Sequence, residues 1–232
     1  MPDIRIKSLD EKEFGGYYAA PKGDKGPGIL VIQEIFGVSA AMRQICDDYA
    51  TKGYMALCPD LFWRQQPGVQ LTDKTPAEWD RAFELYKGFD VEAGVRDLLS
   101  TLAHIRAMPG CSGKVGAVGY CLGGKLAFLM ASRSDVDASV SYYGVDLDKL
   151  LDEVHDIRMP YLMHIAGLDK FVTKPVRDKI LAGIKKNPVI TAYVYENADH
   201  AFARPGGQNY NKEAADLANS RTAEFFARNL QG

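Results

Sequence analysis

Short, continuous apolar runs recur along the chain and alternate with segments whose apolar positions repeat every three or four residues. A run of this kind is typical of a strand that is covered on both faces. The runs occupy residues 28–33, 54–58, 115–120, 138–143, 161–166 and 190–195. Residues 3–7 and 13–19 alternate apolar and polar positions instead, which predicts an opening antiparallel pair.

The segments between these runs predict helices. Thr75 and Pro76 form a start signal, with threonine at the N-cap and proline at the first helical position. The clearest apolar face belongs to residues 90–107, and further helices are expected at 42–52, 124–132, 176–185 and 213–229. Strands that alternate with helices predict an α/β fold, with a mostly parallel sheet of roughly eight strands covered by helices on both faces. We expect one domain over residues 1–232, because no repeat, low-complexity tract or linker interrupts the pattern.

Composition narrows the class of protein. The chain has 232 residues, is 47% hydrophobic and carries a formal net charge of −2, which argues against nucleic acid or an anionic membrane as its partner. No apolar run approaches the ~18 residues of a membrane span, and the N-terminus lacks a signal peptide, so we expect a cytoplasmic protein. The histidines lack metal-ligand spacing and no nucleotide loop is convincing, so neither a metal nor a cofactor is expected.

Residues 115–124 place a cysteine between an apolar strand and a helix, in the motif Gly119-Tyr120-Cys121-Leu122-Gly123. α/β-Hydrolases usually carry a serine at this point, on a sharp turn that exposes the nucleophile. The N-terminus of the following helix directs its free N–H groups, that of Leu122 included, at the sulfur and at a neighbouring oxyanion. The motif therefore predicts a cysteine-dependent hydrolase. Cys46 and Cys58 are interpreted as buried apolar residues, and Cys111 as a loop residue.

A thiol nucleophile needs a base, and the base needs an orienting acid. His200 follows the last predicted strand, which is the usual place for the base, whereas His104, His155 and His164 are interpreted as core or surface residues. Asp169 directly follows the strand at 161–166 and is the best candidate for the acid; Asp146, Asp148 and Asp156 compete with it less well. Asp199, beside the base, is interpreted as a solvated or turn residue.

Glu34 ends the apolar run at 28–33, where a carboxylate costs free energy unless it is exposed or paired. The simplest interpretation is an ordinary acid at a strand end. In α/β-hydrolases, however, this loop donates the second N–H of the oxyanion hole. We therefore expect the N–H of Ile35 to join that of Leu122, with Glu34 close to Cys121.

Together these motifs resemble the dienelactone hydrolase (carboxymethylenebutenolidase) family over nearly the whole chain. The resemblance rests on Gln33-Glu34-Ile35-Phe36-Gly37, Gly119-Tyr120-Cys121-Leu122-Gly123-Gly124, Tyr142-Tyr143-Gly144, Asp169 with Phe171-Val172, and His200-Ala201-Phe202-Ala203-Arg204. It implies a Cys121-Asp169-His200 triad and a thiol that stays protonated, turned towards Glu34, until substrate arrives. It also implies hydrolysis of a small anionic enol-lactone, 4-carboxymethylenebut-2-en-4-olide, to maleylacetate in (chloro)aromatic breakdown. Arg204 would bind the carboxylate, and Tyr142 and Phe36 match pocket positions.

The sequence departs from that family on the helix after the long loop at 60–75. Trp79 and Phe83 stand where family members place an arginine and a tyrosine, and Arg81 lies two residues from the arginine position. Arg81 reaches the pocket only if the start of the helix is shifted. Trp79 and Phe83 predict a more apolar pocket, with plain helix packing as the alternative interpretation. Ala201 replaces a common serine.

Two alternatives stay open at this point. One is a carboxylesterase or thioesterase that acts on other small esters or lactones. The other is a non-catalytic ligand-binding or thiol-sensing protein, against which the complete set of Cys121, Asp169, His200 and Glu34 argues. The sequence says little about oligomeric state, and we expect a monomer with a small, anionic lactone or ester as its partner.

Overall fold

A computed structural model of the chain describes residues 4–231. Its backbone divides into two compact units, Met1–Gly116 and Ala117–Gly232. Each unit contains strands with helices packed on them, and each is described in turn. The expectation of a single domain stays a prediction.

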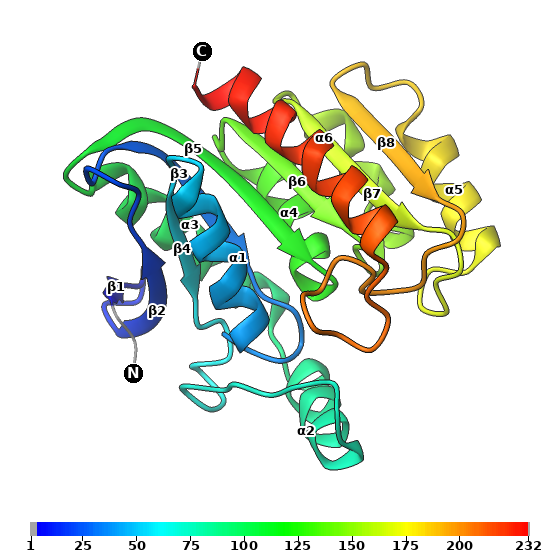
Figure 1. Ribbon diagram of the computed structural model, residues 1–232, viewed down its shortest axis with the longest axis horizontal. Helices are drawn as coiled ribbons and strands as arrows, with labels where there is room; N and C mark the ends of the chain where they lie inside the picture. Colours follow the sequence, from blue (N-terminus) through cyan, green and yellow to red (C-terminus); the bar gives the residue numbers. More distant parts are fainter. Residues whose placement is uncertain (1–3, 232) are drawn as a thin grey trace. The chain divides into compact units, whose positions relative to one another are not determined.

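The first unit is built on four strands. β1 (Ile4–Lys7) pairs antiparallel with β2 (Glu13–Ala19), and β2 pairs antiparallel with β4 (Met55–Pro59). β4 pairs in parallel with β3 (Gly26–Ile32). The predicted opening pair is therefore confirmed, except that Asp3 lies outside the described residues. α1 (Ala40–Thr51) packs on one face of these strands and α3 (Val91–Ala107) on the other (Figure 1).

Polar side chains fix the starts of the helices in this unit. The Thr75 hydroxyl accepts a hydrogen bond from the N–H of Glu78 and caps α2 (Pro76–Lys87), as its sequence predicts. The Asp90 carboxylate caps α3 through the N–H of Ala93. Ser39 caps α1, which begins two residues before the predicted start at Met42.

The second unit contains three parallel strands, β6 (Ala138–Tyr142), β7 (Tyr161–Ala166) and β8 (Ile190–Tyr195). α4 (Leu122–Arg133) packs behind β6, whereas α6 (Lys212–Leu230) lies across the front of β6 and β7 (Figure 1). α5 (Lys174–Ile184) packs on two short 3₁₀ turns, η1 (Leu147–Lys149) and η2 (Leu151–Asp156), which the sequence pattern did not predict.

The long strand β5 (Cys111–Tyr120) starts in the first unit and ends in the second. It begins at Cys111, so the interpretation of this residue as part of a loop is wrong. The strand order is β1-β2-β4-β3-β5-β6-β7-β8. The antiparallel pairings involve β1 and β2, while β3–β4, β6–β7 and β7–β8 are parallel. The predicted α/β architecture, with a mostly parallel eight-stranded sheet and helices on both faces, is thereby confirmed.

Candidate active site

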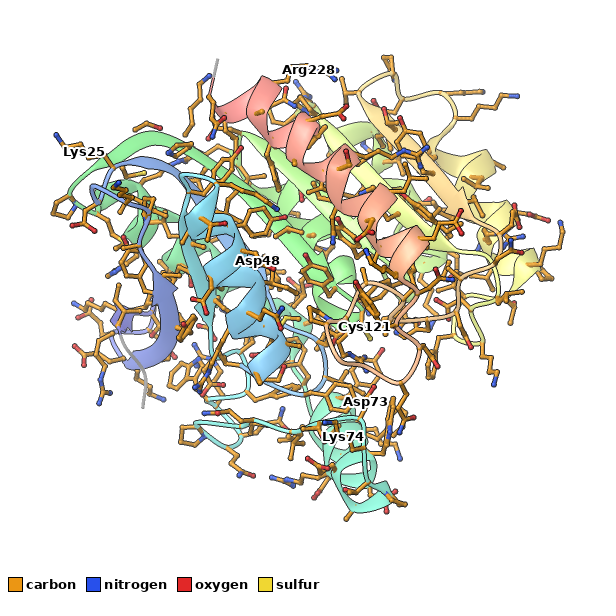
Figure 2. All side chains as sticks on the ribbon, in the orientation of Figure 1. Lys25, Asp48, Asp73, Lys74, Cys121 and Arg228 are labelled. Carbon is orange, nitrogen blue, oxygen red and sulfur yellow. The ribbon has the colours of Figure 1, made fainter. Side chains whose placement is uncertain are left out.

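The second unit holds Cys121 at the turn between β5 and α4 (Figure 2). The cysteine adopts φ 57° and ψ −114°, a backbone conformation that side chains other than glycine rarely occupy. Its N–H donates a hydrogen bond of 3.1 Å to the carbonyl of Tyr142, at the end of β6. The surrounding structure therefore maintains a strained residue at the expected position of the nucleophile.

Gly119 and Gly124 make this turn possible. A Cβ atom on Gly119 would lie 1.8 Å from the carbonyl oxygen of Gly123, and one on Gly124 would lie 2.7 Å from the Cα of Gly144. Real side chains do not approach backbone atoms this closely, so α4 can begin directly after the strand only with glycine here. The structure confirms the sharp strand-to-helix turn that the motif predicts.

The second unit also brings Asp169 and His200 together. Asp169 lies in the loop after β7 and His200 in the loop after β8. Asp169 Oδ2 is 2.7 Å from His200 Nδ1, and both side chains are buried. The other carboxylate oxygen, Oδ1, accepts hydrogen bonds from the N–H groups of Phe171 at 2.8 Å and Val172 at 3.2 Å. These bonds hold the carboxylate so that one oxygen is always directed at the imidazole.

The backbone and neighbouring rings fix His200 itself. Its N–H donates to Asp199 Oδ1 at 2.7 Å, and its carbonyl accepts from Asn209 Nδ2 at 2.9 Å. Asp199 thus has the turn role expected from its sequence position. The rings of Phe171 and Tyr143 lie edge-on to the imidazole, with centroids 4.8 and 5.2 Å away. Because His200 is held from several sides, its Nε2 atom has a defined direction.

The electrostatic surroundings favour the protonated form of His200. Burial lowers the pKa of His200. When Cys121 is a thiolate, however, its charge and the hydrogen bonds to Asp169 and Cys121 outweigh burial and raise this pKa from 6.5 to about 10. Nε2 is buried and has no hydrogen-bond partner of normal geometry among residues 4–231. Cys121 is close enough to the imidazole to raise the pKa of His200 through both its charge and a hydrogen bond.

Tyr142 differs from its predicted role in the substrate pocket. Its side chain is 0% exposed, and its hydroxyl bonds to Asn219 Oδ1 at 2.9 Å and to Thr222 Oγ1 at 2.7 Å, both on α6. These bonds direct the hydroxyl at the helix, so the expectation that Tyr142 contacts substrate is not supported. The neighbouring Tyr143, to which the sequence analysis gave no role, lies against His200 instead.

The hydroxyl of Tyr142 belongs to a buried chain of hydrogen bonds beneath α6. His164 on β7 is 2.8 Å from the hydroxyl of Tyr195 through Nδ1 and 2.9 Å from that of Thr222 through Nε2. Arg221 Nη1 donates to the Tyr195 hydroxyl at 3.2 Å. Burial and the charge of Arg221 lower the pKa of His164 to about 3, so the imidazole is neutral. The interpretation of His164 as a core histidine is confirmed, but its partners could not be predicted from the sequence.

The first unit carries the remaining predicted residues, beginning with Glu34. The Glu34 side chain is 1% exposed and follows the end of β3. Gln33 orders this segment, because its side-chain Nε2 donates to the Glu34 carbonyl at 3.3 Å and its Oε1 accepts from the N–H of Leu61 at 3.0 Å. Ile35 is likewise buried. Glu34 is thus a deeply buried acid rather than an exposed one at a strand end.

Three aromatic residues of the first unit form a cluster. Trp79 stacks on Phe83, with centroids 5.5 Å apart and an interplanar angle of 29°. It also meets Phe36 edge-on at 5.0 Å and an angle of 81°. Its indole N–H donates to the carbonyl of Asp73 at 2.9 Å. The helix-packing interpretation of Trp79 and Phe83 therefore accounts for their contact, and whether they line the pocket stays a prediction.

The two predicted arginines are in different surroundings. Arg81 bonds to Glu84 on the same helix and to Gln66, and it is partly exposed. These partners occupy both terminal nitrogens of the guanidinium, which does not favour a role in substrate binding. Arg204 follows His200 in the second unit and is 6% exposed, and its aliphatic carbons pack against Gly207. The role of Arg204 in binding a carboxylate stays a prediction.

The match to known proteins agrees with this geometry. Residues 14–230 fit the sequence model of the dienelactone hydrolase family. The chain belongs to the dienelactone hydrolase family. A protein of Azospirillum brasilense is 52% identical over 99% of this chain and 100% of its own length. The carboxymethylenebutenolidase of Pseudomonas putida is 44% identical over 97% of this chain and 95% of its own length.

Solved structures of this family have the same fold. A crystal structure from Klebsiella pneumoniae aligns with a TM-score of 0.84 at 26% identity, covering 97% of this chain and 96% of that one. The dienelactone hydrolase of Anabaena variabilis aligns with a TM-score of 0.72 at 19% identity, covering 98% and 96%, and shows the fold alone. The chain is therefore an α/β-hydrolase-fold enzyme that hydrolyses carboxylic esters, against the alternative of a non-catalytic protein.

Two features are absent from the described part of the chain. Between residues 4 and 231 there is no cluster of three or more His, Cys, Asp or Glu side chains that could hold a metal ion. No helix in the same range has the length and hydropathy of a membrane span.

Proposed function

We propose that this enzyme hydrolyses 4-carboxymethylenebut-2-en-4-olide to maleylacetate in the breakdown of (chloro)aromatic compounds. Cys121 is the nucleophile, His200 the base and acid, and Asp169 the group that orients the imidazole. The observation that carries the proposal is the 2.7 Å contact between Asp169 and His200, in the unit where Cys121 occupies a strained strand-to-helix turn. The substrate assignment is supported by 44% identity to the carboxymethylenebutenolidase of Pseudomonas putida.

In the first half of the proposed reaction, the Cys121 thiolate attacks the carbonyl carbon of the lactone and forms a C–S bond. Negative charge develops on the carbonyl oxygen, where we expect hydrogen bonds from the N–H groups of Leu122 and Ile35. When the carbonyl re-forms, the ring C–O bond breaks and the leaving oxygen becomes an enolate. The product of this half is a thioester between Cys121 and the opened substrate.

In the second half, a water molecule attacks the thioester carbon. Its proton passes to His200 or to the enolate, the C–S bond breaks, and the thiolate is restored. Protonation of the enolate gives the ketone of maleylacetate, so that one lactone and one water yield one product. The raised pKa of His200, about 10, suits this cycle because an imidazolium stabilises the departing and returning thiolate.

Glu34 is proposed to accept the thiol proton when substrate arrives; in the resting enzyme the thiol stays protonated and turned towards Glu34. Its 1% exposure supports this role, since a buried carboxylate is stabilised by a neighbouring hydrogen-bond donor such as a thiol. A gated thiol resists oxidation, to which a permanent thiolate is exposed.

Arg204 is proposed to bind the carboxylate of the substrate by its planar fork. Replacing it with Gln should raise KM for the anionic lactone at least tenfold, while KM for a neutral nitrophenyl ester stays within about twofold, because only the lactone has a charge to bind. Steady-state kinetics with both substrates provide the comparison. An equal effect on both would instead assign Arg204 a structural role.

The triad is tested by single substitutions assayed on the lactone. Cys121→Ala, His200→Ala and Asp169→Asn should each reduce kcat by about 10²-fold or more, because each removes the nucleophile, the base or its orientation. Cys111→Ala is the matched control, since it removes a half-buried thiol outside the site. Full activity of Cys121→Ala on every substrate that the native enzyme accepts would refute the nucleophile assignment.

The gate is tested by the rate at which iodoacetamide alkylates Cys121. In Glu34→Gln, we expect the rate of alkylation without an analogue to change. We also expect substrate analogues no longer to accelerate alkylation, because the group that accepts the thiol proton of Cys121 is absent. Native enzyme should react slowly without an analogue and faster with one. A native thiol that reacts at the full rate without any analogue would contradict the gate while leaving the triad intact.

A second candidate function, hydrolysis of less polar esters or thioesters, is favoured by the aromatic cluster of Phe36, Trp79 and Phe83. An activity panel of both dienelactone isomers, protoanemonin, nitrophenyl esters and thioesters decides between the two. The monomeric state and the cytoplasmic location of the protein stay predictions.

A further inference from the structure

The first unit contains a cavity of about 590 Å³ that is lined only by residues of that unit. Its walls come from β1, β2, the segment after β4, residues 67–70 and the start of α1. Ligand pockets in proteins commonly have volumes of about 300–1,000 Å³. The cavity is therefore large enough for a small organic molecule, and none of the triad residues takes part in it.

Two arginines that line the cavity have no acidic partner. Within residues 4–231, the guanidinium groups of Arg5 and Arg43 form neither an ion pair nor a hydrogen bond of normal geometry. Arg5 is exposed on β1, while the Nε atom of Arg43 is buried and unpaired. The guanidinium of Arg43 lies over the Tyr17 ring, with its Cζ atom 5.5 Å from the ring centroid. A buried N–H without an acceptor is costly, and a carboxylate ligand would supply one.

The acidic residues of the cavity do not neutralise these arginines. The carboxylate of Asp60 is already held by the N–H groups of Phe62 at 3.1 Å and Gly68 at 2.6 Å. Glu13 is exposed, and it forms no ion pair with another described residue. The first turn of α1, which carries Arg43 just beyond it, contains no acidic residue that would offset the positive end of the helix dipole. The region between Arg5 and Arg43 therefore favours an anion.

The other walls of the cavity are apolar. Phe14 and Trp63 stack with their centroids 5.4 Å apart and an interplanar angle of 12°. Val69 faces the same space. β2 also contributes the consecutive glycines Gly15 and Gly16 to the lining. A ligand that fills the cavity must therefore combine an anionic group with an apolar body.

We propose that this cavity binds a small organic carboxylate with an apolar ring, at a site separate from the triad. Arg43 and Arg5 hold the carboxylate, and the wall formed by Phe14, Trp63 and Val69 contacts the ring. Such a site adds to the proposed hydrolysis and does not depend on it, because none of these residues takes part in the reaction.

Isothermal titration calorimetry on the full chain tests the site with benzoate as the probe. Benzamide, which keeps the ring without the charge, and acetate, which keeps the charge without the ring, should each bind at least tenfold more weakly. Arg43→Gln should weaken the binding of benzoate at least tenfold, and Arg5→Gln should weaken it by a smaller factor. Arg228→Gln is the matched control, because it removes an exposed arginine on α6 in the other unit, and it should leave binding unchanged (Figure 2).

Three results would overturn the proposal. If benzamide bound as tightly as benzoate, the arginines would not be binding the carboxylate. Loss of benzoate binding in Arg204→Gln, with Arg43→Gln and Arg5→Gln unaffected, would place the anion near His200 instead. An equal loss in Arg228→Gln would indicate a general effect of charge. Arg5→Gln keeps the test valid if Arg43→Gln does not fold, because Arg5 lies on the surface.

Discussion

Two buried histidines of the second unit have opposite protonation states. His200 faces a carboxylate and a thiolate, which raise its pKa to about 10, whereas His164 faces hydroxyl groups and Arg221, and its pKa falls to about 3. Burial alone lowers both values, so the difference comes from the charge of the neighbours. One imidazole therefore serves as a proton carrier, and the other as a neutral donor and acceptor.

The low pKa of His164 predicts a pH dependence of stability. The imidazole of His164 binds a proton near pH 6.5 in the unfolded chain but only near pH 3 in the folded protein. The stability that neutral His164 contributes to the folded state is therefore complete above pH 6.5 and is lost as the pH falls towards 3. Between pH 6.5 and 3, the free energy of unfolding should fall with decreasing pH in the native protein. Its slope should exceed that of His164→Gln by up to about 1.4 kcal/mol per pH unit. Urea unfolding at several pH values measures both slopes, and identical slopes would contradict the prediction.

At the scale of elements, the hydrogen bonds around His164 join three strands to one helix. Arg221 donates to Tyr195, and Tyr142 donates to Asn219. The direction from donor to acceptor is therefore fixed at both ends of this series of hydrogen bonds. Every donor then finds an acceptor only if His164 carries its proton on Nε2 and donates to Thr222. The strands so joined end next to the loops that carry Asp169 and His200 and next to the carbonyl that binds Cys121.

Thr222 is the link between α6 and the strands, and its hydroxyl can be removed with little change in shape. Thr222→Val should lower the free energy of unfolding by about 1–3 kcal/mol, because His164 and Tyr142 each lose a buried partner. Thr222→Ser keeps the hydroxyl and should have a much smaller effect. Denaturant unfolding of the two variants makes the comparison, and equal losses would show that the methyl group, not the hydroxyl, stabilises the helix contact.

For the molecule as a whole, the buried cysteines outside the site report on global unfolding. Cys46 and Cys58 are buried in the first unit, and burial together with the neighbouring Cys58 raises the pKa of Cys46 well above its ordinary value. Cys46 should therefore react with iodoacetamide only when the protein unfolds, whereas the half-buried Cys111 reacts earlier. Mass spectrometry of peptides after timed labelling in increasing urea tests this order. Alkylation of Cys46 well below the unfolding midpoint would refute it.

Much of the architecture could be predicted, because burial imposes a regular pattern on the sequence. β7 and β8 have the predicted bounds, and Thr75 and Asp90 cap helices where polar residues precede apolar periodicity. The triad candidates were predictable for a related reason: parallel strands end at one edge of a sheet, and reactive residues follow those ends. The direction of a side chain within the core depends instead on packing, so the sequence could not predict that the Tyr142 hydroxyl bonds to α6 or that the Tyr143 ring lies against His200.

The unusual backbone at Cys121 has a consequence for how the protein can be improved. Glycine occupies φ 57° without steric cost, whereas a cysteine there stores of order 1–3 kcal/mol of strain. Cys121→Gly should therefore yield an inactive protein that unfolds at a higher denaturant concentration than the native enzyme, as equilibrium unfolding can show. Selection for stability alone would remove the nucleophile, so screens for a more robust enzyme have to score turnover together with folding.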